Sequence, residues 1–153
     1  MLCRIPKARQ SMWRTGENSQ SKGGNTMIIR QLSIFLENRP GTLDAALGIL
    51  KDAGVNISAL SLADTSEFGL LRVIVDKPEE ARQALRTAGY TSSINEVLSV
   101  ELKQEVGYLS SLIKKISGAG VNVEYMYASS SSTSDASMII KTDDSAKAEQ
   151  ALG

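Results

Sequence analysis

A stretch of the chain occurs twice, and this internal repeat limits the possible folds more than any other feature of the sequence. The segment ENRPGTLDAALGILKDAGVNIS, residues 37–58, returns 66 residues later as KQEVGYLSSLIKKISGAGVNVE, residues 103–124. The offset becomes 67 near the C-terminus, where Leu85 corresponds to Leu152. A repeat of this length indicates two similar structural units. The extra residue fits within SSSSTSD, residues 129–135, where we expect a hairpin turn.

Each unit shows the apolar spacing of a strand, a helix, two strands and a second helix. In the first unit, helical spacing begins at Leu43 and ends at Ala53, directly before a glycine suited to a left-handed helix cap. Its strands are expected at 28–37, 56–64, 70–76 and 90–94, and its helices from about Leu43 and Pro78. In the second unit, strands are expected at 97–103, 123–128 and 137–141, and helices from about Tyr108 and Ser145.

This order of elements predicts an α+β fold made of two tandem ferredoxin-like βαββαβ units. Each unit should have an antiparallel sheet with its helices on one face. The second unit lacks its last strand, so we expect either a chain cut at this point or a sheet edge left bare for a partner. The predicted domains are an extension at 1–26, disordered or not native, a first unit at 27–94 and an incomplete second unit at 95–153.

Composition argues against several classes of function. The chain has no histidine and a single cysteine, which removes the commonest general base and the usual metal ligands, so we expect no enzyme activity, metal or cofactor. Residues 1–26 carry five basic side chains against one acidic one. The remainder has 12 basic and 16 acidic residues, which disfavours nucleic-acid binding. No apolar run is long enough to span a membrane, and we expect a cytoplasmic protein.

The least common residue pattern lies at the first strand-to-helix turn, Asn38-Arg39-Pro40-Gly41-Thr42. Glycine can adopt a positive φ there, and the free N–H groups of the helix start favour a carboxylate. Asn56, just after the glycine that ends the helix, offers both a donor and an acceptor. Together these groups could bind a small zwitterion, or they could simply form two tight turns.

The segment ENRPGTLDAALGILKDAGVNI resembles the pattern of ACT domains, small regulatory modules that bind amino acids. Members of that family have a D/N-x-P-G-x-L turn after the first strand and a G-V/I-N-I segment after the helix. The resemblance covers residues 27–153 as two units and implies a ligand held at an interface between two modules. It adds ligand-binding roles for matching positions of the first copy: Asn38, Pro40, Gly41, Thr42, Leu43, Asn56 and Ile57.

The second copy departs from this pattern at its turn. Val106 stands where proline is expected, and Glu105 stands in the position of Arg39, where a carboxylate would repel an anionic ligand group. We therefore expect the copies to be inequivalent, with the first copy better suited to bind an anion. The candidate residues of the second copy are Gly107, Tyr108, Leu109, Asn122 and Val123. Its Tyr125 and Tyr127 could either line a pocket or pack against the sheet.

Several functions fit a ferredoxin-like unit, and the sequence favours one of them. A phosphate-handling enzyme would use Arg39 and Asn56, but the second copy has no arginine at the turn. An RNA-binding module needs aromatic residues on its middle strands, and LLRVIVD has none. We expect a non-enzymatic regulatory protein that binds a small amino acid at an ACT–ACT interface and forms a homodimer, with a regulated enzyme or another protein as a further partner. The alternative is an interaction subunit that associates through exposed sheet edges without a ligand of its own.

Overall fold

The computed structural model describes residues 25–64, 67–130 and 136–153. The expected extension, apart from its last two residues, and most of the expected turn at 129–135 lie outside this part. The elements are β1 (Thr26–Glu37), α1 (Thr42–Asp52), β2 (Ile57–Asp64), β3 (Phe68–Val75), α2 (Pro78–Thr87), β4 (Ser92–Leu102), α3 (Tyr108–Gly118), β5 (Val123–Ser130), β6 (Ala136–Thr142) and α4 (Ser145–Leu152). This order confirms the predicted pair of ferredoxin-like units.

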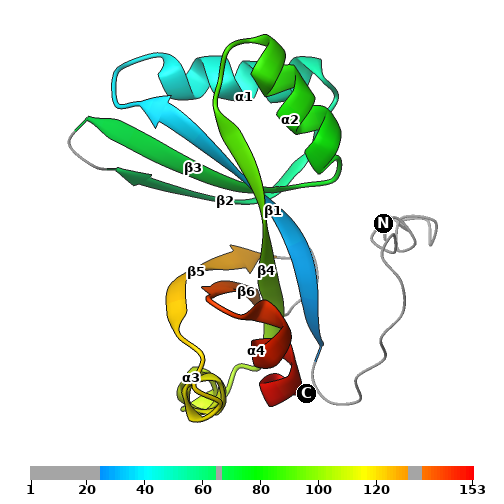
Figure 1. Ribbon diagram of the computed structural model, residues 1–153, viewed down its shortest axis with the longest axis vertical. Helices are drawn as coiled ribbons and strands as arrows, with labels where there is room; N and C mark the ends of the chain where they lie inside the picture. Colours follow the sequence, from blue (N-terminus) through cyan, green and yellow to red (C-terminus); the bar gives the residue numbers. More distant parts are fainter. Residues whose placement is uncertain (1–24, 65–66, 131–135) are drawn as a thin grey trace, which may run out of the picture.

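One six-stranded antiparallel sheet runs through the described chain in the order β2-β3-β1-β4-β6-β5. Figure 1 shows α1 and α2 together at one end of the molecule and α3 and α4 at the other, with β1 and β4 extending through both halves. We call the half with α1 and α2 the first module and the half with α3 and α4 the second module.

β4 is a single strand, although the sequence analysis expected two, at 90–94 and 97–103. Its residues from Ser92 to Val100 pair with β1, and its residues from Leu98 to Leu102 pair with β6 of the second module. The polar residues Asn95 and Glu96, which lie between the two expected strands, continue the ladder opposite Gln31 and Arg30. The predicted boundary at 94/95 therefore falls inside a continuous strand.

Of the two alternatives for the absent last strand, a cut chain or a bare sheet edge, the bare edge is wrong for β4. The N-terminal half of β1 occupies the place of the absent strand: Ile28 pairs with Leu98 and Thr26 pairs with Val100. Ile28 also packs against the core of that module. The strand that opens the first module thus completes the second one as well.

Each module has its own apolar core between its two helices and the sheet. Leu50 on α1 and Leu85 on α2 are fully buried against β1 and β3. Ile116 on α3 and Leu152 on α4 pack in the same way in the second module. The helical stripes read from the sequence thus form the predicted packing faces.

In each module, the sheet face that carries no helices is turned toward the same face of the other module, since β2 and β5 come into contact. A third cluster of buried side chains forms there, made of Ala59, Ile74, Val97 and Ile139. The two modules consequently share an interior that neither helix layer covers.

Candidate functional site

The turn at Gly41 has the backbone conformation that its sequence predicts. Gly41 has a φ of 88° and stands at the N-cap of α1, and no side chain caps the helix start. A Cβ placed on Gly41 would meet no atom within 4 Å. The first turn of the helix is therefore open, and its N–H groups carry the partial positive charge that favours an anion.

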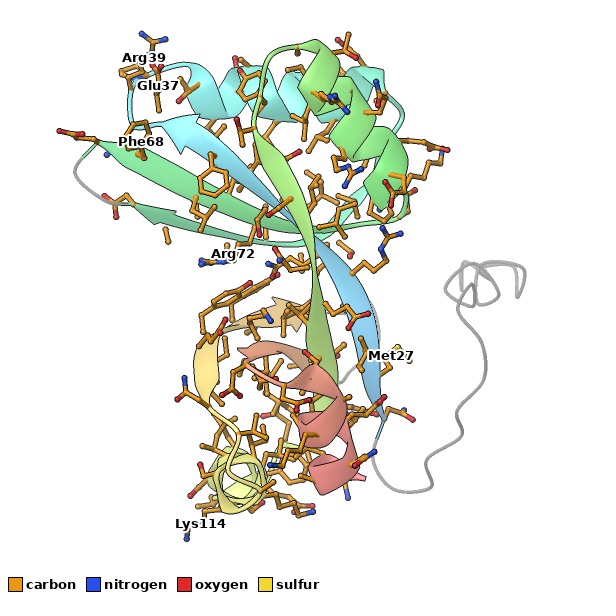
Figure 2. All side chains as sticks on the ribbon, viewed as in Figure 1. Met27, Glu37, Arg39, Phe68, Arg72 and Lys114 are labelled. Carbon is orange, nitrogen blue, oxygen red and sulfur yellow. The ribbon has the colours of Figure 1, made fainter. Side chains whose placement is uncertain are left out.

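Two side chains of the turn are occupied in closing it. The hydroxyl of Thr42 lies 2.7 Å from the carbonyl oxygen of Glu37 and 2.9 Å from that of Arg39, so its proton is donated within the turn. The Arg39 guanidinium forms an exposed ion pair with the Glu37 carboxylate, with 2.8 Å between Nε and Oε2. Figure 2 shows the Arg39 and Glu37 side chains together at one end of the molecule. Backbone N–H groups remain the main donors for a ligand at this turn.

Asn56 is fixed through its backbone. Its N–H donates to Oδ1 of Asp76 at 2.9 Å, and its carbonyl accepts from the Asp76 N–H at 3.2 Å. Asn122 and Asp143 repeat this arrangement in the second module at 3.0 and 3.2 Å. The exposed carboxamide of Asn56 makes no hydrogen bond within the described part of the chain, so it can bind a ligand.

Within one module the structure does not bring Gly41 and Asn56 together. They stand at opposite ends of α1, whose 11 residues give it a length of about 16 Å. Because β1 and β2 are both antiparallel to β3, they are parallel to one another. The Gly41 turn consequently lies at the end of the sheet that holds Asp64, and Asn56 lies at the other end.

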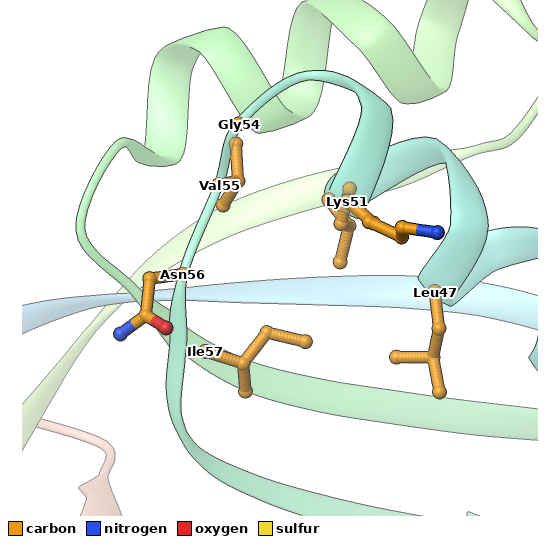
Figure 3. A pocket seen from close by; sticks show the side chains of 7 residues that line it. Leu47, Lys51, Gly54, Val55, Asn56 and Ile57 are labelled. Carbon is orange, nitrogen blue, oxygen red and sulfur yellow. The ribbon is translucent and has the colours of Figure 1, made fainter.

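Asn56 and Ile57 line an open cleft of about 470 Å³ between α1 and the start of β2 (Figure 3). Leu47, Leu50 and Val55 give it an apolar lining, and Lys51 adds a cation. The sequence analysis missed Leu47 and Lys51 as candidates. From the helical spacing, Leu47 was expected in the core and Lys51 in solvent. Both lie beside Asn56 because β2 packs beneath α1.

The second module repeats the turn geometry with different chemistry. Gly107 has a φ of 83° at the N-cap of α3, and Tyr108 and Leu109 follow it. Asn122 directly precedes β5, and Val123 is its first residue. Val106 is fully exposed, and the Glu105 carboxylate stands near the helix start, which opposes the binding of an anion. The expected difference between the two turns thus has a chemical basis but remains a prediction.

Other kinds of site find no support in the described residues. No three aspartate or glutamate side chains among them come together in a way that could hold a metal ion. No helix among these residues is long and apolar enough to cross a membrane.

Comparison with known families gives one match that covers most of the chain. The model of the ACT domain pair matches residues 27–152. No curated protein sequence matches the chain significantly.

Several solved structures share the fold. Protein BT0572 from Bacteroides thetaiotaomicron is 34% identical, with 84% of this chain and 88% of that chain covered and a TM-score of 0.76. The ligand-free regulatory subunit of aspartate kinase from Thermus thermophilus is 16% identical, with 83% and 93% covered and a TM-score of 0.60. The corresponding subunit from Thermus flavus is 15% identical, with 84% and 94% covered and a TM-score of 0.58.

Proposed function

Because the chain belongs to the ACT domain pair family, we propose that it is a non-enzymatic, cytoplasmic regulatory protein that binds a small amino acid between ACT modules. The observation that carries this proposal is the open helix start at Gly41, where the N–H groups of the first turn offer partial positive charge to a carboxylate, with Asp44 as the acidic side chain of that turn. The Thermus subunits that share the fold are described as regulatory subunits of aspartate kinase. Their role supports a regulatory function here, with a regulated enzyme as a possible partner.

A second copy of the chain would bring the two halves of the candidate site together. β2 is at an edge of the sheet, and Leu60 and Leu62 on it are 54% and 49% exposed. If β2 of a second copy lay antiparallel to this edge, its Asn56 would reach the end of the sheet where the Gly41 turn of the first copy lies. We therefore propose a homodimer in which each ligand contacts both copies.

In such a site the groups would divide the recognition of a zwitterion. The N–H groups following Gly41 would bind the ligand carboxylate, assisted by the positive end of α1. The Asn56 carboxamide of the second copy would accept a hydrogen bond from the ligand ammonium through its oxygen. Leu43 and Ile57 would contact the ligand side chain, whose identity would depend on how the two copies pack.

A thermal-shift screen against the common amino acids at millimolar concentration tests the proposal. An amino acid present at about 100 times its Kd should add about 2.7 kcal/mol of stability, which corresponds to a rise of several degrees in Tm. Gly41→Asp should abolish the rise by repelling the carboxylate. Gly41→Asn is the matched control, since asparagine tolerates the same positive φ without adding charge.

The second module supplies a further comparison. Gly107→Asp should weaken binding less than Gly41→Asp does, because Glu105 already disfavours an anion at that turn. Equal losses from the two variants would contradict the proposed inequivalence of the modules. A screen in which no amino acid raises Tm would contradict the sensor proposal itself.

The alternative function is an interaction subunit without its own ligand, and the exposed leucines on edge strand β2 favour it. In that case the edge would bind a partner protein regardless of amino acids. Leu60→Lys should then abolish the association with the partner, while the thermal-shift screen stays flat. Under the sensor proposal the same variant would lower both the dimer population and the amino-acid response.

A further inference from the structure

Arg72 lies between the two modules and has no acidic partner in the described part of the chain. Its side chain is partly buried on the face of β3 that is turned away from α1 and α2, and none of the ion pairs in that part involves it. Its guanidinium lies over the ring of Tyr125 on β5, with Cζ 3.7 Å from the ring centroid. Figure 2 shows Arg72 at the junction of the two halves. A cation stacked in this way keeps the N–H groups at its edge available for a carboxylate.

A buried amide next to Arg72 fixes the direction of the neighbouring hydroxyl groups. Gln31 is 0% exposed, and its Oε1 accepts a hydrogen bond of 2.8 Å from the Tyr127 hydroxyl. Burial raises the pKa of Tyr127, which keeps this hydroxyl protonated as a donor. The Gln31 Nε2 group then donates to the Tyr125 hydroxyl at 2.7 Å and to the Ser33 hydroxyl at 3.1 Å.

Since each hydroxyl has one proton and these two oxygens accept from Gln31, both protons remain for another acceptor. No acceptor for the proton of Tyr125 or Ser33 occurs among the residues that the structure describes. Ser33 and Ser61 are the two neighbours of Arg72 across the sheet, on β1 and β2. Hydrogen-bond donors thus lie beside a cation that has no anionic partner within residues 25–64, 67–130 and 136–153.

The next positions outward on the same face are apolar. Leu70 precedes Arg72 by two residues along β3, with Phe35 and Ala63 as its neighbours across the sheet. Phe35 is 50% exposed. A row of donors therefore borders a row of apolar side chains, at the spacing of two residues in a strand, about 7 Å.

The fold does not require this chemistry. At the related positions of the other half, Arg72 is replaced by Ile139, Tyr125 by Ala59 and Gln31 by Val97. Those three residues are buried and belong, with Ile74, to the apolar cluster between the modules. The modules can thus pack together through apolar contacts, so packing alone does not explain the presence of Arg72, Tyr125 and Gln31.

We propose that the Arg72 corner, formed by Arg72, Tyr125, Ser33, Ser61, Leu70 and Phe35, binds a small carboxylic acid with an apolar tail. The carboxylate would pair with the Arg72 guanidinium and accept a hydrogen bond from Tyr125. The tail would lie on Leu70 and Phe35. This site is separate from the Gly41 turn and does not depend on the proposed amino-acid site.

The corner should prefer a plain carboxylate to an amino acid. Along β1 on this face, the carboxylate beyond Phe35 is that of Glu37, two residues farther, and it is paired with Arg39. An ammonium group bound beside the ligand carboxylate would find no carboxylate partner and would be repelled by Arg72. The expected ligand class is therefore an aliphatic or aromatic acid without an amino group.

Titration of the full chain with 4-methylpentanoate, 4-methylpentanamide and L-leucine, followed by NMR, tests the inference. The acid should bind saturably at millimolar concentration, and the amide and L-leucine should leave the signals of Tyr125 unchanged. Arg72→Met should weaken binding about tenfold or more, the effect of losing a charged hydrogen bond. Tyr125→Phe keeps the stacked ring and should weaken binding by a smaller factor.

Arg86→Met is the matched control, since Arg86 lies exposed at the end of α2 and should leave binding unchanged. Arg72→Lys keeps the charge and guards against a folding defect in the methionine variant. Absence of saturable binding by the acid up to about 20 mM would overturn the inference. So would equal binding by the amide, or acid binding that survives Arg72→Met. If the rise in Tm with an amino acid is lost in Gly41→Asp but kept in Arg72→Met, the amino acid binds at the Gly41 turn and not at the Arg72 corner.

Discussion

Thr142 offers a sharp test of how the second core is built. It ends β6 opposite Val123, it is 0% exposed, and its hydroxyl is a buried side-chain group with no hydrogen-bond partner among the residues that the structure describes. The equivalent residue in the first module is Val75, which ends β3 opposite Ile57 and packs in that core. The repeat therefore places a hydroxyl in one core where the other has a methyl group.

Replacing Thr142 with valine should stabilise the protein. The change keeps the β-branched shape, removes the desolvated hydroxyl and adds a methyl group to an apolar environment. An unsatisfied buried polar group costs about 1–3 kcal/mol. For a chain of this size each kcal/mol corresponds to about 2–4 °C in Tm, so Thr142→Val should raise Tm by at least about 2 °C.

Urea and thermal unfolding of two reciprocal variants measure this effect. Thr142→Val should raise the free energy of unfolding, and Val75→Thr should lower it by a similar amount, with an unchanged dependence on urea for both. A neutral or destabilising Thr142→Val would refute the reasoning. It would show that the hydroxyl has a partner, such as a buried water, whose loss outweighs the gain.

Further predictions concern glycines and an ion pair in the first module. Gly48 lies inside α1 with free space around it, so Gly48→Ala should stabilise by about 0.5–1 kcal/mol. Gly54 has a φ of 70°, so Gly54→Ala should lower the free energy of unfolding by about 1 kcal/mol or more. Denaturant unfolding of both variants measures these opposite effects. The hydrogen bond from Arg30 lowers the pKa of Glu79 below its ordinary value of 4.5. The stability that this pair adds is therefore present above that value and lost as the pH falls through the lower folded-state pKa, and Glu79→Gln should flatten the stability profile below pH 4.5.

The repeat made the elements of each module predictable because local signals agreed with the fold. Glycines ended the helices where the pattern required, and both helix caps have the expected geometry: Val55 and Val121 donate back to the carbonyls of Leu50 and Ile116. The apolar stripes of α1 and α3 could likewise be read from the sequence, since each packs on one face only.

The sharing of strands could not be read in this way. Asn95 and Glu96 are polar because they lie where β4 passes from one core to the next, and polarity at such a position looks like a turn in the sequence. The pairing of Ile28 with Leu98 depends on contacts between residues far apart in the chain, which no local pattern encodes.

The candidate site was only partly predictable for the same reason. The turn at Gly41 follows from local backbone chemistry. The separation of Gly41 from Asn56, and the position of Arg72 between the modules, depend on how strands are ordered and how the sheet curves.

The double use of β1 has a consequence for biosynthesis. The segment that begins at Thr26 leaves the ribosome early, yet its partner in the second core, Leu98, follows Ile28 by 70 residues. At about 5–20 residues per second, the wait is about 4 to 14 s. During that time the nascent chain presents an unpaired strand end to chaperones and to neighbouring chains. A ribosome pause between the two halves would prolong this exposure, so the speed of translation in that interval should affect the yield of native protein.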